Sequence, residues 1–259
     1  MTVHYEVEGP IAVVVIDRPE VRNAIDGPAA RQLAEAFTAF ENNDSLAVAV
    51  LTGADGTFCA GADLKAVSSG ENNLRVDMEG AGPLGCSRMS LSKPVIAAVE
   101  GHAVAGGLEL ALWADLRVAA DDAVFGVYCR RWGVPLVDGG TIRLPRLIGQ
   151  SHANDMILTG RGISGDEALH MGLANRLTAP GKALQEARVL AEQLSGFPQR
   201  CLRSDRQSSY EQWGMEFNEA LRNETTLGMA TIQSGETREG ATRFAQGAGR
   251  HGTLSLIHI

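Results

Sequence analysis

Short apolar runs recur along the first half of the chain and predict β-strands. Residues 3–7 alternate apolar and polar side chains, residues 11–16 form a solid apolar run, and the Glu8-Gly9-Pro10 turn between them predicts a β-hairpin. Three further short apolar runs predict buried strands, at residues 46–52, 94–99 and 114–119.

A segment of helical spacing separates the hairpin from the first of these buried strands. Residues 29–40 repeat apolar side chains every three or four positions, and Pro28 suits the first turn of a helix. The other intervals are weakly amphipathic or rich in glycine. Because strands that alternate with helices form parallel sheets, the pattern predicts an α/β fold.

The pattern becomes almost entirely helical after about residue 144. A last short strand is predicted at residues 175–178, and Ser164 followed by Glu167 is typical of a capping-box helix start. Helices are predicted at residues 151–158, 164–171, 181–194, 198–210, 215–227 and 237–245. We therefore divide the chain into a core, residues 1–195, and a helical region, residues 196–259.

Charge and composition exclude several classes of protein. The chain has 259 residues and a net charge of −8, which argues against binding to a nucleic-acid duplex, and its aromatic content of 5% argues against base-stacking surfaces. The first ten residues have no apolar core, and no apolar run reaches the roughly 18 residues of a membrane span, so we expect neither a signal peptide nor a membrane partner. Four scattered cysteines without a CxxC pair are typical of unpaired thiols in a reducing cytoplasm, where we expect the protein.

Glycine is the unusual residue, with 30 in 259. It gathers in two segments, residues 57–64 and 101–110, and each follows a predicted strand and precedes an expected helix. Small residues let a ligand approach the backbone, and a helix start leaves N–H groups unpaired. Two such groups aimed at one point would form an oxyanion hole. Either segment alone would equally suit an ordinary strand-to-helix junction.

A series of ordered motifs carries a family resemblance over nearly the whole chain. They are Ile16-Asp17-Arg18-Pro19-Glu20 with Asn23-Ala24, residues 58–64, residues 99–110 with Ala114-Asp115, Phe125-Gly126, Gly139-Gly140-Thr141 with Leu144-Pro145-Arg146 and Ile148-Gly149, Thr159-Gly160, and Ala168 with Gly172-Leu173. Together they resemble the enoyl-CoA hydratase/isomerase family, the crotonases. The resemblance implies a spiral of ββα repeats that binds acyl-CoA, followed by a helical C-terminal trimerisation region. It also implies a homotrimer or homohexamer, no metal, and no cofactor apart from the coenzyme A of the substrate.

The resemblance assigns the catalytic groups to particular positions. The two oxyanion-hole amides fall on Ala62 and Gly106, and the first catalytic glutamate falls on Glu109. Because Glu109 lies in an apolar stretch, burial is expected to raise its pKa, as suits a proton shuttle; the alternative is a glutamate on the wet face of a helix. The second catalytic glutamate of the family falls on Cys129, where this chain has no carboxylate. We interpret Cys129 as a small lining residue, although the adjacent Arg130 and Arg131 could lower its pKa.

Asp138 is the candidate for the missing acid. It follows Cys129 on a loop that borders the acyl pocket in the family, and the alternative is that it caps the helix beginning near Gly139. The resemblance further implies substrate-binding residues at Arg22, Ala24, Ala60, Asp63, Leu64, Cys129 and Phe244, and it places Arg18 and Lys65 in segments that touch coenzyme A. The lysine that often follows the family's C-terminal aromatic is Gly247 here, and Arg243 or Arg250 could replace it.

These residues predict an enoyl-CoA hydratase or isomerase that stabilises a thioester enolate. Isomerisation needs only removal and return of a proton, whereas hydration also needs a positioned water. Two alternatives remain open: other crotonase chemistry, such as thioester hydrolysis or C–C cleavage with Asp138 as base, and a CoA-thioester-binding protein with little turnover.

Overall fold

The computed structural model describes residues 2–249, which fall into two compact units, Met1–Ala191 and Glu192–Ile259. The boundary between them lies within helix α6 (Ala183–Ser195). The last segment, residues 250–259, lies outside the described residues and includes Arg250.

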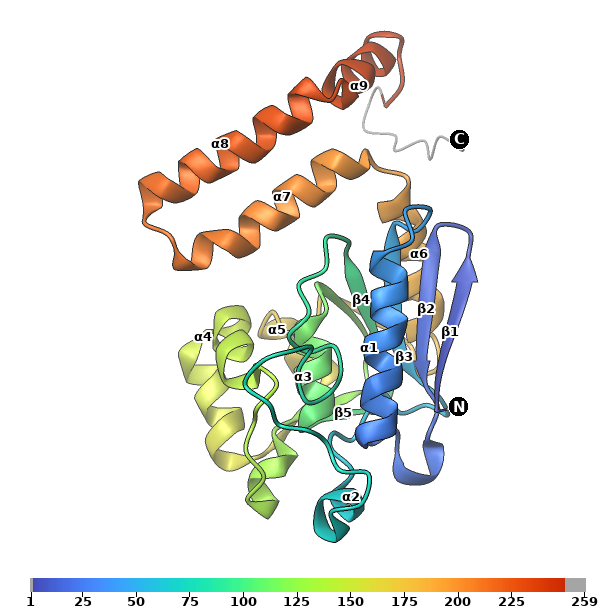
Figure 1. Ribbon diagram of the computed structural model, residues 1–259, viewed down its shortest axis with the longest axis vertical. Coiled ribbons are helices and arrows are strands. Elements are labelled where there is room, and N and C mark those ends of the chain that lie inside the picture. The colour runs from blue at the N-terminus through green and yellow to red at the C-terminus, as the bar shows by residue number, and fades with distance from the viewer. Residues whose placement is uncertain (1, 250–259) are drawn as a thin grey trace. The chain divides into compact units, whose positions relative to one another are not determined.

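The first unit is built on a six-stranded sheet (Figure 1). Its strands, in spatial order, are β1 (Val3–Glu8), β2 (Ile11–Ile16), β3 (Val48–Gly53), β4 (Val95–Val99), β6 (Leu116–Ala120) and β9 (Arg176–Thr178). The predicted hairpin is confirmed, since β1 and β2 pair antiparallel, and every later neighbour is parallel. The central strands are buried along their length, as a parallel sheet covered on both faces requires.

A second sheet of three very short strands lies beside the first. It consists of β5 (His102–Val104), β7 (Val124–Gly126) and β8 (Gly162–Ser164). Three-residue strands carry no readable alternation, which is why the hydrophobic pattern does not predict them. Strand β5 follows the Gly101 turn and leads into α3 (Gly106–Trp113), so this sheet fixes the second glycine-rich segment.

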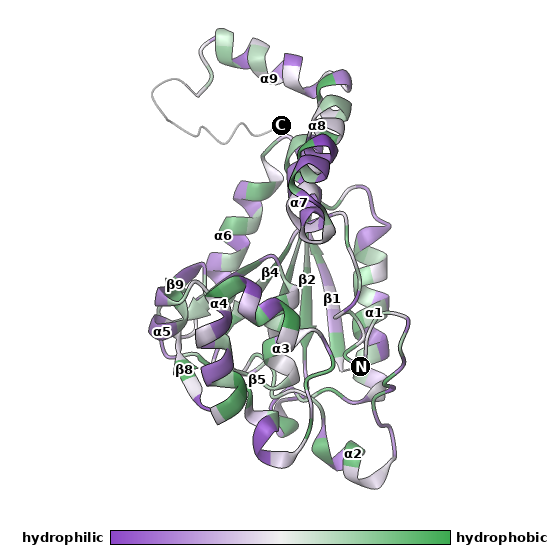
Figure 2. Cartoon of the chain, turned by 90° about the vertical axis from the view of Figure 1, so that its left-hand side faces the viewer, coloured by the Kyte–Doolittle hydropathy of each residue, from purple (hydrophilic) through white to green (hydrophobic). Residues whose placement is uncertain are grey.

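Helix α1 (Gly27–Glu41) confirms the predicted amphipathic segment and shows how the sequence sets its start. The Asp26 carboxylate accepts a hydrogen bond from the Ala29 amide (2.9 Å), and Pro28 lies in the first turn. On its buried face, the Phe37 ring meets the Trp113 ring edge-on at 4.7 Å between centroids. Figure 2 shows α1 and α6 on opposite sides of the larger sheet.

Helix α4 (Gly140–Thr159) begins well before the predicted start at residue 151. Pro145 lies inside it, and Gly149 interrupts it with a left-handed backbone (φ 76°), so its apolar residues do not keep one helical phase. The remaining helices of this unit are α2 (Leu64–Ser69), α5 (Gly165–His170) and the 3₁₀ turns Pro19–Val21 and Tyr128–Trp132. The Ser164 hydroxyl accepts from the Glu167 amide, which confirms that cap, but the Glu167 carboxylate pairs with Arg161 instead of closing the box.

The second unit consists of α7 (Gln199–Glu211), the 3₁₀ turn Gln212–Gly214, α8 (Phe217–Gln233) and α9 (Glu236–Ala245). Within its described part, residues 192–249, only Thr231 is buried, so none of the apolar side chains of these helices is fully buried. Figure 2 shows hydrophilic and hydrophobic residues alternating along α7, α8 and α9. Its exposed large apolar side chains are Tyr210, Trp213, Phe217, Leu221, Met229, Ile232 and Phe244. Over residues 2–249, each helix is too short or too polar to cross a membrane.

Candidate active site

The two glycine-rich segments lie against each other in the first unit. The Cys59 amide donates to the His102 carbonyl (2.9 Å), and the Val104 amide donates back to the Cys59 carbonyl (3.1 Å). The contact requires glycine, because a Cβ on Gly107 would stand 2.0 Å from the Cys59 carbonyl oxygen, and a Cβ on Gly61 would stand 2.7 Å from the Gly106 nitrogen. Segments far apart in sequence are thus held together by their main chains.

Two main-chain amides at this contact are free to bind an anion. Ala105 has a positive φ (54°), rare for a residue with a Cβ, and this turn makes Gly106 the first residue of α3. Among residues 2–249, neither the Ala62 amide nor the Gly106 amide has a hydrogen-bond acceptor. Both residues keep part of their surface exposed. Free amides on two adjoining loops are one requirement of an oxyanion hole.

Glu109 lies one turn into α3 and is buried, with 2% of its surface exposed, so the alternative of a solvent-facing glutamate is wrong. Its Oε1 accepts hydrogen bonds from the Asp138 amide (2.9 Å) and the Gly140 amide (2.8 Å). Burial raises the pKa of Glu109 from its ordinary 4.5 to about 7, with a further increase from the charge of Asp138, while the Gly140 and Asp138 amides oppose the rise. Both of these bonds end on Oε1.

Asp138 lies beside Glu109, but its carboxyl is engaged elsewhere. Asp138 Oδ1 accepts from the Leu84 amide (3.0 Å) and from the Ser87 hydroxyl. The side chain does not cap α4, whose N-cap is Gly139 in a left-handed conformation, so that alternative is wrong. Burial raises the pKa of Asp138, and the Ser87 hydrogen bond is the largest opposing influence.

Cys129 lies in the 3₁₀ turn Tyr128–Trp132 and is buried. Burial raises the pKa of its thiol, the charge of Glu109 raises it further, and Arg130 lowers it by less. The hypothesis that neighbouring arginines activate the thiol is therefore wrong. The family resemblance expects a second carboxylate at this position, where the chain has a thiol.

Several residues expected to contact coenzyme A surround the segment of Ala62, and the structure shows how each is held. Ala24 is buried, Arg22 and Leu64 are exposed, and Ala60 is half-buried, with its amide donating to the Arg22 carbonyl (3.1 Å). Asp63 is the N-cap of α2 and accepts from the amides of Lys65 and Ala66. The Arg18 guanidinium is already paired, since it is held between the carboxylates of Asp26 (2.9 Å) and Asp63 (3.1 Å). It braces the loop that carries Ala62, and Lys65 stays exposed.

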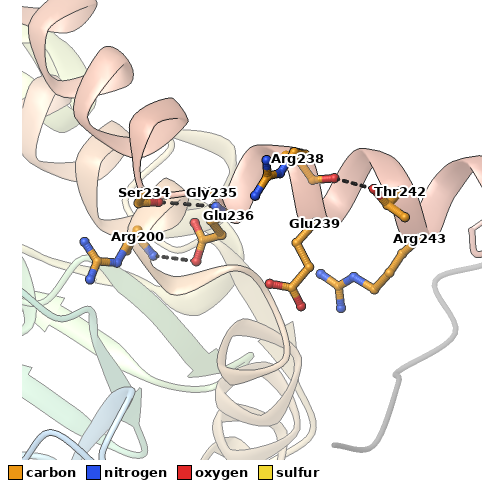
Figure 3. A pocket seen from close by; sticks show the side chains of 8 residues that line it. All are labelled: Arg200, Ser234, Gly235, Glu236, Arg238, Glu239, Thr242 and Arg243. Atoms are coloured by element: carbon orange, nitrogen blue, oxygen red, sulfur yellow. Dashed lines mark hydrogen bonds between the residues drawn. The ribbon is translucent and has the colours of Figure 1, made fainter.

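Phe244 belongs to the second unit and is 63% exposed. The same unit contains a pocket at the start of α9, shown in Figure 3. Its charged lining residues are Arg200, Glu236, Arg238, Glu239 and Arg243. The Glu236 carboxylate accepts from the amides of Arg200 (3.2 Å) and Cys201 (2.8 Å), so it is committed to the start of α7.

Sequence patterns missed the segment that holds Asp138. Leu84 and Ser87 come from a loop without apolar periodicity, and their role depends on a contact across about fifty positions of the chain. Three closely spaced glycines, Gly80, Gly82 and Gly85, were the available signal. No group of three metal-ligating side chains is found within residues 2–249.

Comparisons with known proteins agree on one family. Residues 6–248 match the sequence profile described as Enoyl-CoA hydratase/isomerase. An enoyl-CoA hydratase of Mycobacterium tuberculosis, EchA19, is 36% identical over 93% of this chain and 92% of its own length. A carnitinyl-CoA dehydratase of Proteus mirabilis is 38% identical over 75% of this chain and 74% of its own. Among solved structures, an enoyl-CoA hydratase from Mycobacterium tuberculosis is similar with a TM-score of 0.89 and 38% identity, covering 95% of this chain and 96% of that one.

Proposed function

The chain belongs to the enoyl-CoA hydratase/isomerase family, the crotonases, and from this membership we propose that it is an enoyl-CoA hydratase or isomerase acting through a thioester enolate. The observation that carries the proposal is the position of Glu109. Its buried carboxyl stands one helical turn beyond the free Gly106 amide, and its pKa of about 7 suits both removal and return of a proton near neutrality.

In the proposed mechanism, the thioester carbonyl oxygen accepts hydrogen bonds from the Ala62 and Gly106 amides. Charge that develops on this oxygen in the enolate strengthens both bonds, which lowers the barrier. Glu109 Oε2 exchanges a proton with the carbon next to the carbonyl, while the two amides on Oε1 keep the carboxyl in place. In hydration, water adds its hydroxyl to C3 and a proton reaches C2; in isomerisation, one proton is removed and returned at another carbon.

The names of the relatives favour hydration or its reverse, because the matched proteins are called enoyl-CoA hydratase and carnitinyl-CoA dehydratase. Cys129 favours isomerisation, since its thiol is neutral near pH 7 and cannot serve as a second carboxylate. Both reactions remain within the proposal, and the substrate is an acyl-CoA thioester in either case.

The proposed partners follow from the same family. We expect Arg22, Ala24, Ala60, Asp63, Leu64 and Cys129 to contact the substrate, and Phe244 with Arg243 to contact the coenzyme A of a neighbouring subunit. The exposed apolar side chains of α7 to α9 would be covered in a homotrimer or homohexamer, which sedimentation would detect. No separate cofactor is proposed, and we expect the protein in the cytoplasm.

A direct assay separates the two reactions. Crotonyl-CoA is tested for loss of the conjugated enoyl absorbance, and a 3-enoyl-CoA for its appearance. Glu109→Gln should abolish whichever reaction the enzyme performs. Full activity in that variant would overturn the mechanism, and absence of turnover with retained CoA-thioester binding would favour a binding protein.

A second candidate is thioester hydrolysis or C–C cleavage with Asp138 as base. It is favoured by the burial of a second carboxyl beside Glu109. Asp138→Asn tests this candidate. If Asp138 is the base, the substitution should abolish hydrolysis or C–C cleavage. If the variant still hydrates enoyl-CoA, Asp138 does not carry the proton in that reaction.

A further inference from the structure

The turn at residues 82–88 touches both parts of the candidate site. The Gly85 amide donates to the Gly82 carbonyl (2.9 Å), and the Arg88 amide donates to the Ala81 carbonyl (3.0 Å), so the turn is closed by its own main chain. On one side, a Cβ on Gly106 would stand 3.1 Å from Leu84 Cδ1, so the Leu84 side chain packs against an oxyanion-hole donor. The other side faces Asp138.

Ser87 makes the contact with Asp138. Its side chain is fully buried, and its hydroxyl donates to Asp138 Oδ1, which also accepts from the Leu84 amide (3.0 Å). Gly82 makes room for this hydroxyl: a Cβ there would stand 2.2 Å from Ser87 Oγ. Two donors from one turn therefore satisfy one carboxylate oxygen.

Arg143 joins the same two segments at the main chain. Its Nη1 donates to the Asp138 carbonyl (2.9 Å), and its Nη2 donates to the Ser87 carbonyl (2.7 Å). The Asp138 residue is thus held at its carboxylate and its carbonyl, while its amide donates to Glu109 Oε1 (2.9 Å). A continuous series of hydrogen bonds runs from Ser87 through Asp138 to Glu109.

We propose that Ser87 is a positioning residue for proton transfer: through Asp138, its hydroxyl fixes the loop that holds Glu109 Oε1 and keeps a negative charge beside the Glu109 carboxyl. This inference rests on the proposed function, in which Glu109 is the proton shuttle. Ser87 itself does not reach the reacting atoms in this scheme.

The sign of its effect follows from the groups that face Asp138. Burial raises the pKa of Asp138, and the Ser87 hydroxyl, the Leu84 amide, Arg88 and Arg143 oppose the rise. The charge of Asp138 in turn adds to the burial that raises the pKa values of Glu109 and Cys86. Loss of the hydroxyl removes the largest influence that lowers the pKa of Asp138. At any pH where Asp138 then holds a proton, its charge no longer raises the pKa of Glu109, which loses its own proton at lower pH.

The test compares Ser87→Ala with Ser90→Ala, a matched control because Ser90 is exposed on the same segment. Ser87→Ala should lower kcat about tenfold through misplacement of Glu109, with little change in KM. The acidic limb of the kcat/KM pH profile should move to lower pH, because the charge of Asp138 raises the pKa of Glu109. Ser90→Ala should leave both unchanged.

Two further measurements separate this inference from the proposed function. A carbon-13 titration of the Glu109 carboxyl, assigned with Glu109→Gln, should give the same downward shift in Ser87→Ala without any need for turnover. In an Asp138→Asn background, Ser87→Ala should produce no further shift, because its effect passes through that carboxylate. If Ser87→Ala folds poorly, Ser87→Cys replaces it in the test. Cysteine keeps a side chain of similar volume and a weak hydrogen-bond donor, so the Glu109 titration should shift in the same direction by a smaller amount.

An unchanged Glu109 titration in both Ser87 variants would overturn the inference, whether or not turnover is found. An unchanged pH profile with a tenfold loss of kcat would also overturn it, since misplacement alone is a structural role. Absence of enoyl-CoA turnover in the wild-type protein, with the titration shifted as expected, would overturn the proposed function and leave the Ser87 connection standing.

Discussion

Replacing Glu109 by glutamine should abolish turnover and also stabilise the folded protein at alkaline pH. Glutamine keeps the shape of the side chain and an oxygen that can accept from the Asp138 and Gly140 amides. It removes the ionisation of a carboxyl whose surroundings disfavour charge. Loss of a proton shuttle of this kind lowers a rate by about 100- to 10,000-fold.

The magnitude of the stabilisation follows from the pKa of Glu109. In the folded protein it is about 7, against an ordinary value of 4.5, so the folded state holds the proton more tightly than the unfolded state. Stability that is fully present below pH 4.5 is then lost as the pH rises to about 7. The loss amounts to about 3 kcal/mol above pH 7, at roughly 1.4 kcal/mol for each pKa unit. Because glutamine does not ionise, the Glu109→Gln variant keeps this stability as the pH rises.

Urea unfolding at pH 5 and at pH 8.5 measures this effect, with the wild-type protein and Glu109→Gln compared at each pH. The difference in unfolding free energy should favour the variant by about 2 to 3 kcal/mol more at pH 8.5 than at pH 5. Asp166→Asn, on the exposed surface of α5, is the matched control and should show no such change. A variant destabilised equally at both pH values would refute the assignment of a raised pKa to Glu109.

Further substitutions test the surrounding site. Asp138→Asn should move the acidic limb of the pH profile to lower pH, because the charge of Asp138 raises the pKa of Glu109, and a pH–rate profile measures it. Cys129→Ala should keep kcat within a few-fold of wild type in the enoyl-CoA assay, because a thiol with a raised pKa carries no proton near neutrality. Gly107→Ala should lower the melting temperature and remove activity, because the new Cβ would clash with the Cys59 carbonyl. Its control is Gly228→Ala in α8, where open space surrounds the new Cβ and the melting temperature should rise slightly.

The sequence predicted those elements of the fold whose apolar periodicity, turns and caps all lie within a short segment of the chain. The hairpin β1–β2, helix α1 and the buried strand β4 each carry an apolar period and a turn or cap within a few residues, and each is where the sequence expects it. Strands β5, β7 and β8 form because their main-chain partners come from distant segments. No local pattern of apolar side chains therefore predicts them. The start of α4 was missed for a related reason, since Pro145 interrupts its periodicity.

The candidate site divides in the same way. The glycine clusters indicated two segments, residues 57–64 and 101–110, in which the family resemblance then assigned Ala62 and Gly106. The apolar stretch around Glu109 predicted its burial, which is also a property of a short segment. The sequence also singled out Asp138, but its two alternatives, working acid or helix cap, did not include the hydrogen bonds from Leu84 and Ser87. Such contacts depend on a turn without periodicity that reaches across the fold, and only the structure brings them together.

In the proposed mechanism, the pKa of Glu109 is raised toward neutrality without a second carboxylate at position 129. Burial and the charge of Asp138 raise its pKa, and the amides of Gly140 and Asp138 lower it, with a result near neutrality. Three of these influences come from the loop at residues 137–140, and Cys129 contributes no charge to them. Burial is the largest of these influences on the pKa of Glu109, and the loop that supplies the others is held by Ser87, Leu84 and Arg143. Substitutions of Ser87 or Arg143 should therefore alter the pH dependence of kcat/KM more than substitutions of Cys129 do.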